Sequence, residues 1–138
     1  MCDSNDLQKL LSQFLVTDEL SLILNDLDAI PVVTEGGVKC GHQELKGDFV
    51  APEQQWRLPG NFSDEDMPGY DEKTDIWKVP SVCNYFLRDV PGGDDVIMQL
   101  SSIHKHCKSV DPNLRPTAQE LVSHYLAVKR NVIERDMR

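Results

Sequence analysis

The sequence predicts a mainly α-helical fold that begins with a short β-hairpin and continues through a long irregular segment into the helices. Two apolar runs near the N-terminus have the length of strands, and later segments repeat apolar residues at intervals of three and four. Between them, glycines and prolines interrupt residues 28–71. With 138 residues the chain can bury a single core, so we expect one domain or part of one.

The hairpin is predicted at residues 12–16 and 21–25. Both runs are apolar, and Thr17, Asp18 and Glu19 form an acidic turn between them. From residue 28 to residue 56 the chain has no periodic pattern, which indicates a loop. Irregular segments of this length inside a compact domain are usually functional.

The first long helix is predicted to begin near Thr74. Asp71 or Thr74 is suited to cap its start, because both side chains accept backbone hydrogen bonds. Pro80 falls inside the apolar pattern, so the helix is either kinked there or begins later. The large apolar side chain of Trp77 is expected to pack in the core.

Two further helices follow. One is predicted over residues 95–109, with a shared apolar face made by Val96, Leu100, Ile103 and Cys107. The other begins at Thr117, which forms a capping box with Glu120. Its buried stripe is predicted to contain Leu121, Tyr125 and Val128, and the charged residues 129–138 are expected to fray.

Glu53 is placed where a carboxylate needs a partner. It follows Pro52 and has apolar neighbours at Val50 and Trp56, and an unpaired carboxylate in an apolar setting costs several kcal/mol. Arg115 is the best candidate, because it lies in a proline-flanked turn before a capped helix. A guanidinium can also bind a carboxylate through two parallel hydrogen bonds.

Composition excludes some functions. The formal net charge is -9, with 23 acidic against 14 basic residues, so neither nucleic acid nor an anionic membrane surface is expected as a general partner. No apolar run approaches the roughly 18 residues of a membrane span. The four cysteines include no pair separated by two residues, which argues against a zinc ribbon. His104 and His106 fall on different faces of one helix and form a poor metal pair.

Asn61 begins an Asn-Phe-Ser triplet, which is an acceptor sequence for N-glycosylation. Asn61 is therefore a candidate glycosylation site. It can be modified only if this segment enters a secretory compartment.

Three segments in order resemble the C-terminal lobe of the protein kinases. Residues 49–54 look like the end of the activation segment, residues 70–79 like the start of the central helix, and residues 103–126 like the last two helices. In closer detail the chain is similar to the protein O-mannose kinase family. The resemblance implies that residues 1–138 are a C-terminal lobe without its N-terminal lobe. It also implies that residues 29–56 are the activation segment and that Glu53 pairs with Arg115.

The resemblance also implies a chemistry. The family transfers phosphate from ATP, with Mg²⁺ or Mn²⁺, to the 6-hydroxyl of mannose in an O-linked trisaccharide of α-dystroglycan. Its members lie in the endoplasmic reticulum membrane, and this segment would be luminal, without membrane contact of its own.

Individual site residues follow from the same resemblance. Asp3 would accept the proton of the sugar hydroxyl, although Met1 and Cys2 stand where kinases have histidine and arginine. Asp26 and Gln13 would bind the metal, and Asp75 would support the catalytic loop. Asp28 replaces the glycine of the metal-binding motif and adds a second carboxylate within reach of a metal.

Two alternatives stay open. Because the glycine-rich loop and the strand lysine of a kinase are missing, we expect the isolated chain to be inactive. A pseudokinase-like module that binds a glycan or protein without catalysis is the first alternative. The second is an ordinary serine/threonine kinase lobe, which the unusual residues after Asp3 disfavour.

Overall fold

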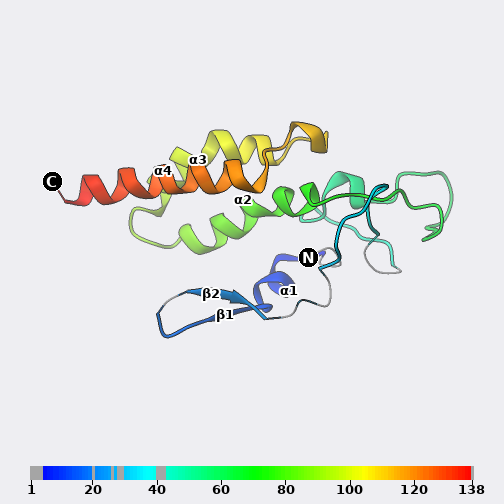
Figure 1. The fold of residues 1–138 in the computed structure, drawn as a ribbon, viewed down its shortest axis with the longest axis horizontal. Coiled ribbons are helices and arrows are strands. Elements are labelled where there is room, and N and C mark those ends of the chain that lie inside the picture. The colour runs from blue at the N-terminus through cyan, green and yellow to red at the C-terminus, as the bar shows by residue number, and fades with distance from the viewer. Residues whose placement is uncertain (1–4, 20, 26, 28–29, 40–42, 138) are drawn as a thin grey trace. The chain divides into compact units, whose positions relative to one another are not determined.

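The computed structural model describes residues 5–19, 21–25, 27, 30–39 and 43–137. The chain divides into two compact units, Met1–Asp75 and Ile76–Arg138. In the described residues the secondary structure is mainly helical, with a two-stranded antiparallel sheet near the N-terminus (Figure 1). The prediction of a mainly α fold with an N-terminal hairpin is therefore confirmed.

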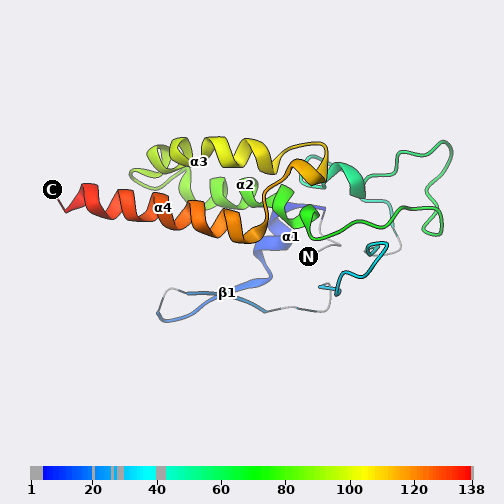
Figure 2. The ribbon, with the colours of Figure 1, turned by 45° about the horizontal axis from the view of Figure 1, so that its top comes forward.

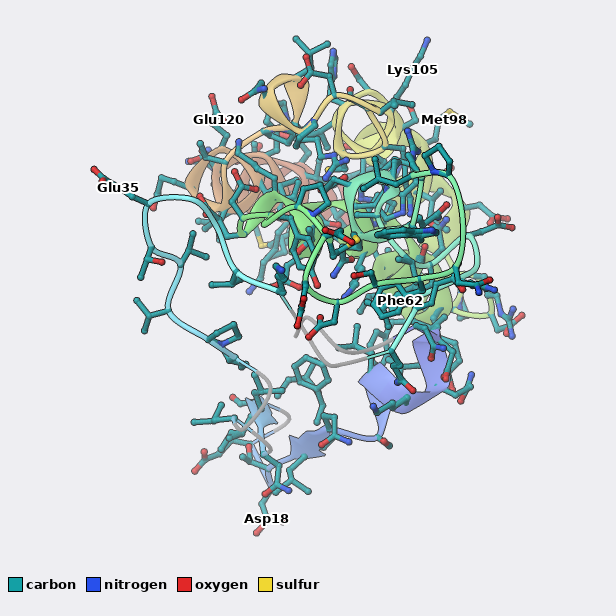
Figure 3. The ribbon with its side chains drawn as sticks, turned by 90° about the vertical axis from the view of Figure 1, so that its right-hand side faces the viewer. Asp18, Glu35, Phe62, Met98, Lys105 and Glu120 are labelled. Atoms are coloured by element: carbon teal, nitrogen blue, oxygen red, sulfur yellow. The ribbon has the colours of Figure 1, made fainter. Side chains whose placement is uncertain are left out.

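The first unit begins with a short helix and the predicted hairpin. The helix α1, Leu7–Leu11, is capped by Asp6, whose carboxylate accepts a 2.7 Å hydrogen bond from the N–H of Lys9. The strands β1, Phe14–Val16, and β2, Leu22–Leu24, then pair with Phe14 opposite Leu24. Figure 3 shows Asp18 at the far end of this hairpin, in the turn. The helix α1 was not predicted, because five residues are too short to reveal a helical period.

Contacts between residues of the first unit that are far apart in the sequence organise its irregular segment. Val38 and Tyr70 form an antiparallel bridge, and Met67 and Tyr70 are the centre of a small apolar cluster with Val38, Trp56 and Phe62. The Nζ of Lys39 donates hydrogen bonds to the carbonyl oxygens of Asp64 and Glu65, at 2.6 and 2.9 Å. These bonds satisfy backbone groups that have no partner in a helix or sheet.

Gly37 is required by close packing in this region. Its φ is 78°, and a Cβ at this position would lie 2.7 Å from the backbone nitrogen of Tyr70. Only glycine fits such a position without displacing backbone atoms. The bridge between Val38 and Tyr70 therefore depends on it.

The second unit is built from helices that share one core. It contains most of α2, Lys73–Leu87, and all of α3, Gly93–Cys107, and α4, Ala118–Asp136. Figures 1 and 2 both show α3 and α4 running side by side. The core contains Ile76, Leu100, Ile103, Cys107, Leu121 and Val128.

Most helical boundaries agree with the predictions. The helix α2 begins at Lys73, whose N–H donates to Asp71 at 2.9 Å, and it continues through Pro80. The capping box of α4 is present, because Glu120 N–H donates to Thr117 Oγ1 at 3.2 Å and Thr117 N–H donates to Glu120 at 2.7 Å. The helix α3 begins at Gly93, two residues before the predicted start.

The expected fraying of residues 129–138 was wrong. The helix α4 continues to Asp136. Val132 packs against the core, and Arg135 pairs with Asp95 of α3 at 3.1 Å. The helix α4 therefore continues past Val128, and Val132 extends its apolar face by one turn.

Candidate functional site

Only one of the three residues predicted to act on substrate or metal lies among the described residues. Asp3 and Asp26 fall outside them, as does Asp28. Gln13 lies in the turn between α1 and β1 and is half-buried. Its side-chain Nε2 donates a hydrogen bond to Ser12 Oγ at 3.3 Å. The amide oxygen of the same side chain is the atom that could coordinate a metal.

The hairpin places Gln13 next to the chain segment that carries Asp26. The carbonyl oxygen of Gln13 accepts a 2.8 Å hydrogen bond from the N–H of Asn25. This bond extends the pairing of β1 and β2 by one residue, so Gln13 lies opposite Asn25. Asp26 follows Asn25 directly in the sequence. The described part of the hairpin therefore fixes Gln13 opposite Asn25, whereas Asp26 itself lies outside the described residues.

The neighbourhood of Glu53 is buried, which is the condition under which its carboxylate needs a partner. Glu53 is half-buried in the 3₁₀ helix Pro52–Gln54, and Val50 and Ala51 before it have no exposed surface. Gln54 is also buried, and its Oε1 accepts a hydrogen bond from Ala51 N–H at 3.3 Å. The backbone around Glu53 is therefore held in one conformation.

Arg115 is buried and well bonded within the second unit. Only 3% of its surface is exposed. Its Nε donates to the carbonyl oxygen of Ser109 at 2.9 Å, and its guanidinium carbon lies 5.1 Å from the centre of the Trp77 ring. Because Glu53 and Arg115 belong to different units, their pairing stays a prediction.

Trp77 contacts two cations. Besides Arg115, the Nζ of Lys108 lies 4.5 Å from the centre of the Trp77 ring and donates to Ser81 Oγ at 3.4 Å. The ring is half-buried. A tryptophan face attracts cations, so Trp77 holds the turn before α4 against α2. Sequence reasoning treated Trp77 as core and missed this role.

The first two turns of α2 carry two charged residues of different exposure. Asp75, the predicted support for the catalytic loop, is exposed, whereas Lys78 is only 2% exposed. A buried ammonium group is costly unless it is paired. Sequence reasoning did not single out Lys78. In the sequence, Lys78 stands among apolar residues three positions after Asp75, and this pattern could have indicated that its side chain is buried.

Asn61 lies at an exposed bend in the first unit. The bend is held by Trp56, whose indole N–H donates to the carbonyl oxygen of Gly60 at 3.1 Å and whose ring meets Phe62 edge to face. An exposed asparagine at a fixed bend is accessible for modification, as a glycosylation site must be.

Two negative findings concern the described residues alone. They contain no group of three or more histidine, cysteine, aspartate or glutamate side chains arranged to hold a metal. None of their helices combines the length and the apolar character that crossing a membrane requires.

Comparison with curated proteins shows a strong similarity over almost the whole chain. It is 53% identical over 133 residues to the protein O-mannose kinase of Gallus gallus, and 52% identical over 133 residues to that of Homo sapiens. Each alignment covers 93% of this chain. Over this region the chain is similar to the protein O-mannose kinases.

The match covers only part of the length of the protein O-mannose kinases. The chain spans 38% of the length of the chicken and human proteins and of the one from Xenopus laevis, to which it is 51% identical. No family model matches the chain. A match over almost the whole chain nevertheless supports the resemblance that the three kinase-like segments indicated.

Proposed function

We propose that the chain forms the part of a glycan kinase that carries the catalytic and metal-binding residues. The observation that supports this most strongly is its 51–53% identity to proteins named protein O-mannose kinase. Residues 1–138 then form the C-terminal lobe, and residues 29–56 are the activation segment. Glu53 and Arg115 pair to hold the end of that segment, and Asp75 supports the catalytic loop.

The proposed reaction transfers the γ-phosphate of ATP to a sugar hydroxyl. Asp3 accepts the proton of that hydroxyl. Asp26 and Gln13 would hold Mg²⁺ or Mn²⁺, which would supply positive charge against the phosphates. The bond between Gln13 and Asn25 supports the metal assignment, because it fixes Gln13 opposite the residue that precedes Asp26 in the sequence.

The proposed acceptor is the 6-hydroxyl of mannose in the O-linked trisaccharide of α-dystroglycan. The reaction would take place in the lumen of the endoplasmic reticulum, in a protein held in its membrane. This assignment follows the resemblance, and the exposed Asn61 of the glycosylation triplet supports a luminal location.

The test compares phosphate transfer from ATP to the O-mannosyl trisaccharide by the full-length protein and by its Asp3→Asn and Asp26→Asn variants. We expect each variant to lose activity at least about a hundredfold, because Asp3→Asn removes the positioned base and Asp26→Asn removes a charged ligand of the metal that neutralises the phosphates. Asp6→Asn is the matched control, since Asp6 caps α1 and has no proposed role in catalysis. Unchanged activity in either test variant would refute the corresponding assignment.

The same assay separates the alternatives. A pseudokinase-like binding module would bind the trisaccharide but transfer no phosphate under any metal condition. An ordinary protein kinase would phosphorylate serine or threonine peptides in preference to the glycan. The proposed function requires transfer to the trisaccharide and requires it to depend on Mg²⁺ or Mn²⁺.

Glycosylation at Asn61 gives a separate prediction. When the protein is expressed in secretory cells, we expect Asn61→Gln and Ser63→Ala each to remove one glycan, because both destroy the acceptor triplet. The measurement is gel mobility before and after enzymatic removal of N-glycans. Asn84→Gln, at an exposed asparagine outside any such triplet, should leave the mobility unchanged. Unmodified wild-type protein would show that Asn61 is not used.

A further inference from the structure

The helix α4 carries two parallel stripes of side chains along its length. The inner stripe packs in the core of the second unit and contains Leu121, Tyr125, Val128 and Val132. The hydroxyl oxygen of its Tyr125 lies 2.7 Å from Nε2 of His104, on α3. The outer stripe is exposed and contains Val122, Leu126, Lys129 and Ile133. Each stripe repeats at intervals of four, three and four residues.

This spacing is the one by which helices pack along their length. Residues at alternating intervals of three and four form the seam of a coiled coil, in which each side chain fits between residues of the facing helix. The apolar side chains of the outer stripe are 51% exposed at Val122, 54% at Leu126 and 47% at Ile133. Single apolar residues on a surface need no explanation, but a second seam on one helix indicates a second packing partner.

The outer stripe faces away from α3. Arg135 of α4 pairs with Asp95 of α3 at 3.1 Å, so this side of α4 lies toward α3. At about 100° per residue, Leu126 lies on the opposite side of the helix from Arg135. The outer stripe is therefore not the margin of the contact between α3 and α4.

Positive charge marks the middle of the outer stripe. Lys129 stands at the seam position between Leu126 and Ile133, and Arg130 follows it on the flank away from the inner stripe. Both cations are exposed, and neither forms an ion pair with another described residue. A charged residue at one seam position sets the register of the pairing and selects the partner. A partner that covers the stripe must therefore place an anion opposite Lys129.

These features argue against two simple occupants. A second copy that used the whole stripe would bring Lys129 and Arg130 of both copies together at the centre of a symmetric interface, where like charges repel. An anionic membrane is disfavoured by the net charge of -9. The stripe also lacks the tryptophan and phenylalanine side chains that anchor interfacial helices.

We propose that the outer stripe of α4 docks an acidic amphipathic helix of a partner protein. Apolar side chains of that helix pack between Val122, Leu126 and Ile133, and a carboxylate near its middle bonds to Lys129. A second carboxylate on its flank meets Arg130. None of the residues proposed for catalysis or metal binding belongs to α4, so this docking is independent of the proposed reaction.

The test measures binding of fluorescent synthetic helices to the full-length protein by anisotropy. Both probes have about three heptads with leucine at the seam positions, and the central seam position is glutamate in the acidic probe and lysine in the basic probe. Wild-type protein should bind the acidic probe at least about tenfold more tightly. Lys129→Glu should reverse this order, because the repulsion then falls on the acidic probe.

Lys105→Glu is the matched control for charge. Figure 3 shows Lys105 of α3 directed away from the helices, and its reversal should change the affinity for the acidic probe by less than about twofold. Leu126→Ser tests the apolar contact and should weaken binding of the acidic probe at least about tenfold. Because Leu126 is half-exposed, this variant should keep the wild-type helix content by circular dichroism.

Failure of the wild-type protein to bind the acidic probe would overturn the proposal. Equal weakening by Lys105→Glu and Lys129→Glu would do the same, because the attraction would then be general. Self-association that is lost in Leu126→Ser would assign the stripe to a second copy. Binding to phosphatidylserine vesicles that is lost in the same variant would assign it to a membrane, and either result would refute the docking of a partner helix.

Discussion

Replacing Arg115 by alanine is expected to lower the free energy of unfolding by about 3 kcal/mol, since leaving buried carbonyl groups unpaired costs about 1 to 3 kcal/mol and the lost volume adds to that cost. The guanidinium is buried, donates to the carbonyl oxygen of Ser109 and lies over the ring of Trp77. Its removal leaves buried acceptors unpaired and opens a cavity beside the ring. Urea unfolding followed by tryptophan fluorescence measures the loss.

Two control variants show whether the lost stability comes from the donor geometry and burial of Arg115 or from the loss of any arginine. Arg115→Lys keeps the charge but lacks the planar fork of donors, so it should recover only part of the stability. Arg135→Ala removes an arginine whose pair with Asp95 is exposed, and it should cost no more than about 1 kcal/mol. If Arg115→Ala cost as little as Arg135→Ala, the central structural role of Arg115 would be excluded.

The same variant tests the predicted ion pair. In a double-mutant cycle with Glu53→Ala and Arg115→Ala, paired side chains should give a coupling energy of roughly 1 to 3 kcal/mol. Independent side chains should give additive losses. Additivity would separate the buried role of Arg115 in the second unit from any role in holding Glu53.

Gly93→Ala is expected to destabilise the second unit by about 3 kcal/mol, at the upper end of the usual cost of overpacking. A Cβ on Gly93 would collide with the carbonyl oxygen of Leu87, at the end of α2. A flexible side chain could move aside, but this oxygen belongs to the backbone. The start of α3 would therefore have to shift away from α2, and thermal unfolding would report the change.

Gly92 provides the matched control for Gly93. It has a φ of 78°, but a Cβ there would meet nothing within 4 Å. Gly92→Ala should therefore cost about 1 kcal/mol, from the left-handed backbone conformation alone. If Gly92→Ala were the more damaging of the two, backbone conformation would matter more here than close packing.

Local signals predicted the elements that local interactions form. The capping box of Thr117 and Glu120 and the acidic turn between the two strands involve residues close in sequence, and the structure has both features. The apolar spacing of α3 likewise identified the buried residues Leu100, Ile103 and Cys107. Such patterns are readable because each depends on a few adjacent residues and a fixed period.

The end of α4 shows where local reading fails. Residues 129–138 are rich in charge, and propensity alone suggested an unstable end. The helix persists because Val132 reaches the core and Arg135 reaches Asp95, forty residues earlier in the chain. Tertiary packing of one face stabilises most helices in proteins more than their intrinsic propensity does.

The candidate site divides in the same way. Ordered motifs in the sequence indicated the kinase family and proposed Asp3, Asp26 and Gln13 without any coordinates. Only the fold revealed that Gln13 lies opposite Asn25, that Lys78 is buried, and that Trp77 contacts both Lys108 and Arg115.

The sequence by itself therefore indicated the resemblance to protein O-mannose kinases, the order of the elements and the residue types available for chemistry, because these depend on motifs and on local spacing. The tertiary structure alone decided which of those side chains are buried together. The contact of His104 with Tyr125 and the tight approach of Gly93 to Leu87 are examples. Contacts between helices depend on how the chain packs in three dimensions, and no local pattern in the sequence encodes them.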